Sequence, residues 1–395
     1  MSQHRSIAAP RRSGRTRAGV VAAKASVVAL AAALLAQGAV AQARTSAGGA
    51  TATAAASAST KCTAQQGQAF IDEGRYDQAI REFTCVIAAQ PTGVEGYRGR
   101  SEAELLLGRY SDAYADYARV VAFVLPVHPD AYTTILKGYA ARLAIAPEDT
   151  HALTGASFAR WVFFDYTQAI HLVNQLLDVR SDDVYGTLFR GSSRLLLGAS
   201  KERGKADLGG TADLQRAIEL APLSADVRYI VADAYTYGLP DPERAFAEAT
   251  LALDWGLDTP RVHAILASAY LAFGDVAAAA TEIKRHIDLV TTELLSAPTL
   301  APDDSLSLDL VPGRTYEIPV PATAGDTISI ATSSRDFYDT IAVLLAPDGT
   351  PVAGSDDTNA YFAAFDLVAE KSGTYRMQVT SFEGVNTGEL VVTRD

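Results

Sequence analysis

Asp339, Asp356 and Asp357 are the residues whose type and spacing come nearest to a ligand site. They flank short apolar segments near the carboxyl end of the chain, so we expect them on neighbouring loops. Carboxylate oxygens gathered on loops are ligands that Ca²⁺ prefers. Aspartate also favours turns without any metal, because its side chain bonds to the nearby backbone. Calcium is therefore the one cofactor hypothesis, and no other cofactor is expected.

Two other patterns could be taken for catalytic residues. Gly155 and Ser157 have the spacing of a nucleophile elbow, but that turn must join a strand to a helix. Ser157 is expected in the middle of a helix, where a small residue favours close packing. The helical histidines His171, His263 and His286 lack the spacing of a zinc-binding pair. The sequence predicts no catalytic residue, and we do not expect an enzyme.

Cys62 and Cys85 are the only cysteines of the chain. In an exported protein a single pair is more often a disulfide than a metal or redox site. We therefore predict a Cys62–Cys85 bridge. It would close a loop of about two dozen residues and stabilise the fold by about 3 kcal/mol.

The first 43 residues have the composition of an export signal. Six basic residues and no acidic residue are followed by an apolar run at Val27–Leu35 and small residues ending at Ala41 or Ala43. An uncleaved membrane anchor is the alternative, although the apolar stretch is marginal for a bilayer span. Residues 44–60 are small and polar and are predicted to form a flexible linker. We expect a periplasmic, extracellular or cell-surface protein with no membrane span after cleavage.

The net charge limits the partners. The whole chain carries −12 and the first 43 residues carry +6, so the remaining chain would carry about −18. An acidic surface of this size repels phosphate groups. Nucleic acid and anionic lipid are therefore not expected as partners.

The elements that carry these residues repeat with a spacing of 34. The tripeptide Gly74-Arg75-Tyr76 recurs as Gly108-Arg109-Tyr110, and the offset also relates Ala79 to Ala113, Phe83 to Tyr117 and Val86 to Val120. A constant period of this length indicates stacked pairs of helices, each too small to bury a core alone. Such solenoids present extended surfaces, so binding is the expected kind of function.

The pattern within each unit resembles the tetratricopeptide repeat. In the first unit it comprises Gly67, Phe70, Gly74, Tyr76, Ala79, Phe83 and Pro91. We predict five or six such units over residues 61–295, an all-α solenoid. The period is broken at 128–149, where one extra helix is expected, and at Lys201–Thr211.

The resemblance implies that positions two, five, nine, twelve and thirteen of each unit line a partner-binding groove. Here those positions include Arg98, Glu102, His151, Phe158, Trp161, Tyr185, Arg228 and Tyr235. Aromatic and arginine side chains are common anchors at interfaces. Phe158 and Trp161 would form an apolar anchor site, or would instead pack beneath the 128–149 insertion.

The chain changes character after the solenoid. Residues 296–304 have the composition of a linker, and residues 305–395 then alternate apolar and polar positions between turn signals such as Pro312-Gly313 and Asp348-Gly349. Seven or eight short strands of this kind predict an all-β antiparallel sandwich. This region resembles the bacterial pre-peptidase C-terminal domain, a jelly-roll-like module usually attached to secreted proteases. No protease domain accompanies it here.

Together these patterns favour an exported, non-enzymatic scaffold. The solenoid would bind a protein or peptide, and the sandwich would serve adhesion, matrix binding or surface retention. Two alternatives remain open: an accessory partner of a secreted protease, or a carbohydrate-binding module using Phe337, Tyr338, Tyr361 and Phe362. The sequence leaves the oligomeric state open.

Overall fold

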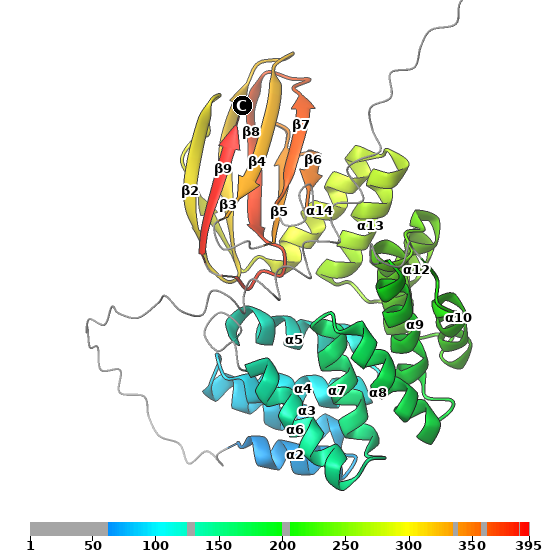
Figure 1. Ribbon diagram of the computed structural model, residues 1–395. Coiled ribbons are helices and arrows are strands. Elements are labelled where there is room, and N and C mark those ends of the chain that lie inside the picture. Colours follow the sequence, from blue (N-terminus) through cyan, green and yellow to red (C-terminus); the bar gives the residue numbers. More distant parts are fainter. Residues whose placement is uncertain are drawn as a thin grey trace, which may run out of the picture.

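The chain folds into a helical part followed by a strand part, as Figure 1 shows. The computed structural model describes residues 62–124, 131–199, 206–334, 339–356, 362–386 and 388–394. The predicted multidomain class, an α-solenoid followed by a β-sandwich, is confirmed. The predicted export signal at 1–43 and linker at 44–60 lie outside the described residues. Among the described residues, no helix is long and apolar enough to cross a membrane.

Thirteen α-helices and one π-helical turn lie within the described residues. They are α2 (Ala64–Asp72), α3 (Tyr76–Ala89), α4 (Val94–Leu106), α5 (Tyr110–Val124), α6 (Ala131–Ile145), α7 (Thr150–Val162), α8 (Tyr166–Val179), α9 (Val184–Gly198), α10 (Gly210–Leu220), α11 (Ala225–Asp233), η1 (Ala234–Gly238), α12 (Pro242–Asp254), α13 (Pro260–Phe273) and α14 (Val276–Val290). Six pairs follow one another, with α6 as the single helix predicted at the first break.

Capping side chains and glycines determine where the helices begin and end. The side chains of Asp149, Asp183 and Asp275 each accept a hydrogen bond from a backbone N–H in the first turn of α7, α9 and α14. These caps satisfy donors that have no partner inside the helix. The repeated glycines Gly74 and Gly108 have φ of 73° and 77°, in the left-handed region that favours glycine. They turn the chain between the two helices of a unit, which explains their 34-residue spacing.

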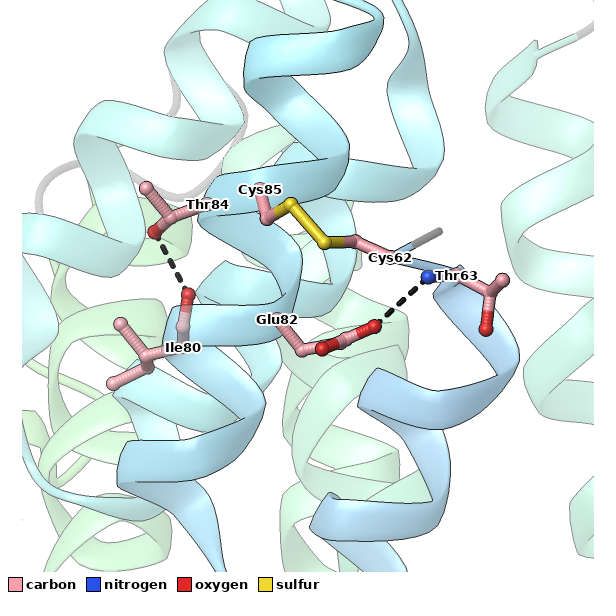
Figure 2. Close-up of a disulfide and its surroundings, with 6 residues drawn as sticks. All are labelled: Cys62, Thr63, Ile80, Glu82, Thr84 and Cys85. Atoms are coloured by element: carbon pink, nitrogen blue, oxygen red, sulfur yellow. Dashed lines mark hydrogen bonds between the residues drawn. A yellow bond between two sulfur atoms is a disulfide. The ribbon is translucent and has the colours of Figure 1, made fainter. Parts of the chain in front are cut away.

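The disulfide predicted between Cys62 and Cys85 is present. It joins Cys62, two residues before α2, to Cys85 of α3, with a Cα–Cα distance of 5.9 Å (Figure 2). Beside it, the backbone N–H of Thr63 donates to Oε1 of Glu82 at 2.9 Å. Both contacts hold the first helix of the terminal unit against the second.

The helix α5 does not continue the regular stacking. Instead it lies against α7 and α11, the first helices of later units, and its Tyr110 ring contacts Phe189 of α9. The backbone N–H of Ser111 donates to Oδ1 of Asp226, 115 residues away, at 2.7 Å. The inserted helix α6 packs along α7. The insertion therefore changes the path of the solenoid rather than only lengthening it.

The strand part consists of two sheets. Its strands are β1 (Glu293–Ser296), β2 (Asp304–Leu310), β3 (Arg314–Ala322), β4 (Thr327–Ser333), β5 (Thr340–Leu345), β6 (Pro351–Ser355), β7 (Ala364–Val368), β8 (Gly373–Ser381) and β9 (Gly388–Arg394). One sheet has the order β1-β3-β8-β5-β6 and the other β2-β9-β4-β7. All pairs are antiparallel except β1 with β3. The side chains between the sheets form one apolar core.

Residues 296–304 are not the free linker that their composition suggested. Strand β1, which ends at Ser296, pairs with β3, and the backbone N–H groups of Ala297 and Leu300 donate to the carbonyl oxygens of Glu317 and Pro319. The Leu300 side chain is fully buried in the sandwich core. The sandwich therefore begins inside the predicted solenoid boundary, at Glu293.

The two parts share an apolar core of their own. Ile283 and Ile287 of α14 pack with Ile341 and Val343 of β5 and with Phe382. Strand β5 is buried along its whole length because its alternate residues face α14 and the sandwich interior. A strand covered on both faces is characteristic of a sheet between two layers. The last helix pair and the sandwich thus form one continuous packed unit.

Candidate functional site

The predicted groove residues are mostly covered. Phe158 is fully buried, and Glu102, Trp161, Tyr185 and Tyr235 are at most 6% exposed. A partner in the groove could not touch Phe158, so the proposed apolar anchor formed with Trp161 is wrong in this structure. The alternative was that the pair packs beneath the insertion at 128–149; the ring contacts of the pair are with Tyr114 and Tyr117 of α5 and with Phe189 of α9.

The helix α5 covers these aromatic side chains. The Tyr117 ring lies edge to face with Phe158 at a centroid distance of 5.3 Å, and Tyr114 does so with Trp161 at 6.0 Å. Tyr110 reaches Phe189 of α9 at 5.5 Å. Aromatic pairs in this geometry stabilise packing beyond the area that they bury. The inner face of α7 and α9 is therefore filled by the protein's own helix.

Glu102 is the centre of a buried charge cluster. Its carboxylate accepts hydrogen bonds from Arg142 at 3.3 Å, Tyr139 at 3.2 Å and Arg98 at 3.4 Å. Arg142 also forms an ion pair with Asp149 at the start of α7. Two predicted groove residues, Arg98 and Glu102, thus join α4 to α6 and α7.

The remaining predicted residues also have internal partners. His151 lies 3.2 Å from the hydroxyl oxygen of Tyr76, which links α7 to α3. Arg228 donates to Glu248 of α12 at 2.7 Å, and its guanidinium lies 5.4 Å from the Trp255 ring centroid. The predicted set is not brought together in one place. Arg98, His151 and Arg228 are partly exposed, and their contact with a partner stays a prediction.

Arg261 is the residue that the sequence reasoning missed. It lies in the first turn of α13, at the second position of its unit, one of the positions the resemblance assigns to the groove. Its guanidinium donates to the Tyr114 hydroxyl of α5, lies 3.5 Å from Asp233 of α11 and contacts Glu383 between β8 and β9. One side chain therefore connects α5, two first helices and the sandwich.

The carboxylates around Arg261 are not equivalent. Burial raises the pKa of Asp233 to about 6, against the opposing effect of the Arg261 guanidinium. Oδ1 of Asp233 is buried and has no hydrogen-bond partner, since Arg261 approaches only to 3.5 Å. Glu383 is more exposed and accepts the shorter bonds.

The catalytic candidates have structural partners. Ser157 lies in the middle of α7, as predicted, and its hydroxyl bonds to the Thr154 carbonyl and the Tyr185 hydroxyl. This geometry has no strand-to-helix turn and no adjacent base. The prediction that Ser157 lies inside a helix is confirmed.

The pKa values of the two buried histidines are shifted in opposite directions. His263 lies between Glu282 and Asp258, with its two ring nitrogens 2.5 and 2.8 Å from their oxygens. Burial lowers the pKa of His263, but the bonds to both carboxylates outweigh it and leave the pKa raised. His286 donates to the Phe382 carbonyl at 2.7 Å, and burial lowers the pKa of His286 to about 4. His171 is exposed, beside Gln175.

The calcium hypothesis gains no support from the described residues. No group of three or more His, Cys, Asp or Glu side chains among them could hold a metal ion. Asp339 and Asp356 lie at the ends of β5 and β6, and Asp357 lies outside the described residues. Phe337, Tyr338 and Tyr361, which were considered for carbohydrate binding, lie outside them too.

A comparison of the sequence with models of known protein families identifies the kind of repeat. Residues 65–124 match the tetratricopeptide repeat model. These residues comprise most of α2 and all of α3, α4 and α5. The four helices form the two units in which the 34-residue spacing is strict. The fold of the tetratricopeptide repeat units thus agrees with the resemblance drawn from the sequence.

Solved structures resemble both parts. A tetratricopeptide repeat protein from Parabacteroides merdae is 16% identical over 58% of this chain and 78% of its own, with a TM-score of 0.34. PilW, a type IV pilus biogenesis factor, is 12% identical over 56% and 89%, with a TM-score of 0.33. The pre-peptidase C-terminal domain of Bacillus anthracis collagenase is 15% identical over 26% and 95%, with a TM-score of 0.23. No curated protein matched the chain.

Proposed function

We propose that this protein is an exported, non-enzymatic scaffold that binds a protein partner. Tetratricopeptide repeats are units without a reaction centre, and their stacked helices offer surface for contact. The helix α5 fills the inner face of the middle units, so the partner binds elsewhere on the solenoid. The exposed turn between α13 and α14 is the surface that supports this proposal most directly.

That turn carries exposed apolar side chains. Leu271, Phe273 and Val276 are 40%, 49% and 48% exposed. The Phe246 ring lies 5.8 Å from Phe273 and 5.2 Å from Tyr270, which extends the patch onto α12. Neighbouring exposed apolar residues on a soluble protein are typical of an interaction surface.

The disulfide supports export. Cys62 and Cys85 are bridged on the terminal unit, and bridges of this kind persist in oxidising compartments. The composition of residues 1–43 agrees with this location. The scaffold would therefore act in the periplasm or outside the cell.

The sandwich would attach the scaffold to a surface or matrix. Its sheet β1-β3-β8-β5-β6 is partly covered by α14, whereas the sheet β2-β9-β4-β7 belongs to the other side of the sandwich (Figure 1). The second sheet therefore remains available for contact. Because the first sheet is packed on α14, anything held by the sandwich would be held at a defined position relative to the turn.

The experiment is capture of a partner by the full chain from the exported fraction of its source. The double variant Leu271→Ser/Phe273→Ser should reduce recovery of the partner at least tenfold. The matched control, Ile145→Ser/Leu223→Ser, removes two more exposed apolar side chains on other turns and should leave recovery unchanged. Equal recovery by both double variants would remove the α13–α14 turn as the binding surface.

A further inference from the structure

Two buried titratable side chains of the helical part act on adjacent residues of the segment between β8 and β9. Nε2 of His286 lies 2.7 Å from the carbonyl oxygen of Phe382. Asp233 is linked to Glu383 through Arg261, whose guanidinium lies 3.5 Å from the Asp233 carboxylate and 2.9 Å from that of Glu383. A change of charge at either side chain therefore acts on the same joint between the helical part and the sandwich.

The surroundings of Asp233 favour its neutral form. The residue is 4% exposed, and its Oδ1 is buried without a hydrogen-bond partner. The cation beside it, Arg261, is shared with Glu383. The other titratable groups that face Asp233 are the phenols of Tyr114 on α5, Tyr166 on α8 and Tyr229 on α11. Burial raises the pKa of Asp233 to about 6, although the Arg261 guanidinium opposes the shift.

The surroundings of His286 also favour the neutral form. Its ring is fully buried against the Phe382 ring, at a centroid distance of 4.5 Å, and its Nδ1 has no hydrogen-bond partner. The charged groups that face it are Glu383 of the sandwich and Arg261 of α13, and their effects on its pKa are opposite in sign. A proton on His286 would add a second buried cation beside Arg261. Burial lowers the pKa of His286 to about 4.

The two shifts have opposite consequences for stability, because the neutral carboxyl carries a proton and the neutral imidazole lacks one. The folded pKa of Asp233 lies above its unfolded value of about 3.9, so its contribution to stability is complete below that value and is lost as the pH rises through about 6. The folded pKa of His286 lies below its unfolded value of about 6.5, so its contribution is complete above that value and is lost as the pH falls toward about 4. Mild acid therefore strengthens the joint through Asp233 and weakens it through His286.

We propose that Asp233 and His286 form a compensating pair that keeps the joint equally stable in neutral and mildly acidic surroundings. Between pH 7 and pH 5, Asp233 lowers the equilibrium constant for opening of the joint about tenfold, and His286 raises it about twentyfold. The two changes cancel to within about twofold. Such a pair suits an exported protein, which meets the pH of its surroundings, but the compensation itself does not depend on export.

The test is hydrogen exchange of α13, α14 and β5 in the full chain at pH 7 and pH 5, corrected for the intrinsic exchange rate at each pH. Opening constants are compared for the unmodified protein, Asp233→Asn, His286→Gln and the double variant. The double variant lacks both groups, so its pH dependence gives the contribution of all the others. Relative to it, acid should increase opening about twentyfold in Asp233→Asn and decrease it about tenfold in His286→Gln. The unmodified protein should follow the double variant to within about twofold.

Two exchange results would overturn the proposal. One is an Asp233→Asn variant with the same pH dependence as the unmodified protein. The other is an unmodified protein whose pH dependence differs from that of the double variant by more than about fivefold. The matched control Asp182→Asn removes an exposed carboxylate that pairs with Arg216 and should leave the pH dependence unchanged.

A second measurement needs no variant, so it tests the proposal even where a variant fails to fold. NMR titration of the Asp233 carboxyl carbon and the His286 ring protons in the unmodified protein gives both pKa values. Asp233 should titrate near pH 6 and His286 near pH 4. An Asp233 pKa near about 3.9 or a His286 pKa near about 6.5 would contradict the compensation.

Discussion

Arg261 and Glu383 form the charged contact that joins the helical part to the sandwich: Nε and Nη2 of Arg261 lie 3.1 and 2.9 Å from the same oxygen of Glu383. The two residues are 122 positions apart in the chain. Arg261 also bonds to Tyr114 of α5, so the contact fixes three separate segments at once. A solenoid and a sandwich joined in this way, and by the core around α14, should behave as one body.

Replacing Arg261 by methionine should destabilise the protein by about 3 kcal/mol, because Asp233 and Glu383 would lose the cation that balances them in a largely buried place. Urea unfolding followed by circular dichroism measures the free energy of unfolding. The control Arg216→Met breaks two exposed ion pairs, which are screened by solvent, and should change the stability little. Equal losses for the two variants would show that Arg261 is only a surface residue.

Acid should weaken the joint between α14 and the sandwich through His286. Burial lowers the pKa of His286 to about 4, whereas a histidine in an unfolded chain has a pKa of about 6.5. Between these two pH values the unfolded chain binds a proton at this residue and the folded protein does not. The free energy of unfolding should fall by about 2 kcal/mol between pH 7 and 5 because of this group. In His286→Gln that part of the pH dependence should disappear, as urea titrations at several pH values would show.

His263 should act in the opposite direction. Its pKa is raised above the ordinary value because its ring lies between Glu282 and Asp258, so the folded protein keeps a proton that the unfolded chain releases. The stability that it contributes is complete below about pH 6.5 and is lost as the pH rises through the raised pKa. NMR titration of the ring protons measures that pKa directly. A value below that of a free histidine would contradict the raised pKa.

Removing the disulfide should loosen the first repeat only. The double variant Cys62→Ser/Cys85→Ser releases a bridge between residues 23 positions apart, worth about 3 kcal/mol. Hydrogen exchange should then rise in α2 and α3, while α13 and α14 keep their protection. A loss of protection throughout the solenoid would mean that the terminal unit opens together with the other units.

The regular parts of the fold could be predicted because they depend on local pattern. Gly74 and Gly108 mark identical turns, and Gly67 recurs as a small residue because a Cβ there would lie 2.6 Å from the Phe83 ring. The single helix α6 followed from the break in the 34-residue spacing, and the Cys62–Cys85 bridge followed from a single cysteine pair in a chain with an export signal. Each of these features is determined within one or two units.

The position of α5 and the docking of the sandwich could not be predicted, because they depend on contacts between distant segments. Nothing near Ser111 indicates its bond to Asp226. The linker prediction failed at Leu300, the single large apolar residue of 296–304, which completes the sandwich core. One signal was present: Ile341–Leu345 is apolar without alternation, as expected of a strand covered on both faces.

The claim that the last helix pair and the sandwich form one body is tested most directly by hydrogen exchange in Ile283→Asp. Ile283 is fully buried between α14 and β5, and its Cδ1 would lie 3.1 Å from a Cβ at Gly354 of β6. We predict faster exchange in α13, α14, β5 and β6 together. Ile71→Asp, in the separate core of the first unit, should leave all four unchanged. Faster exchange in α13 and α14 with β5 and β6 still protected would contradict the claim.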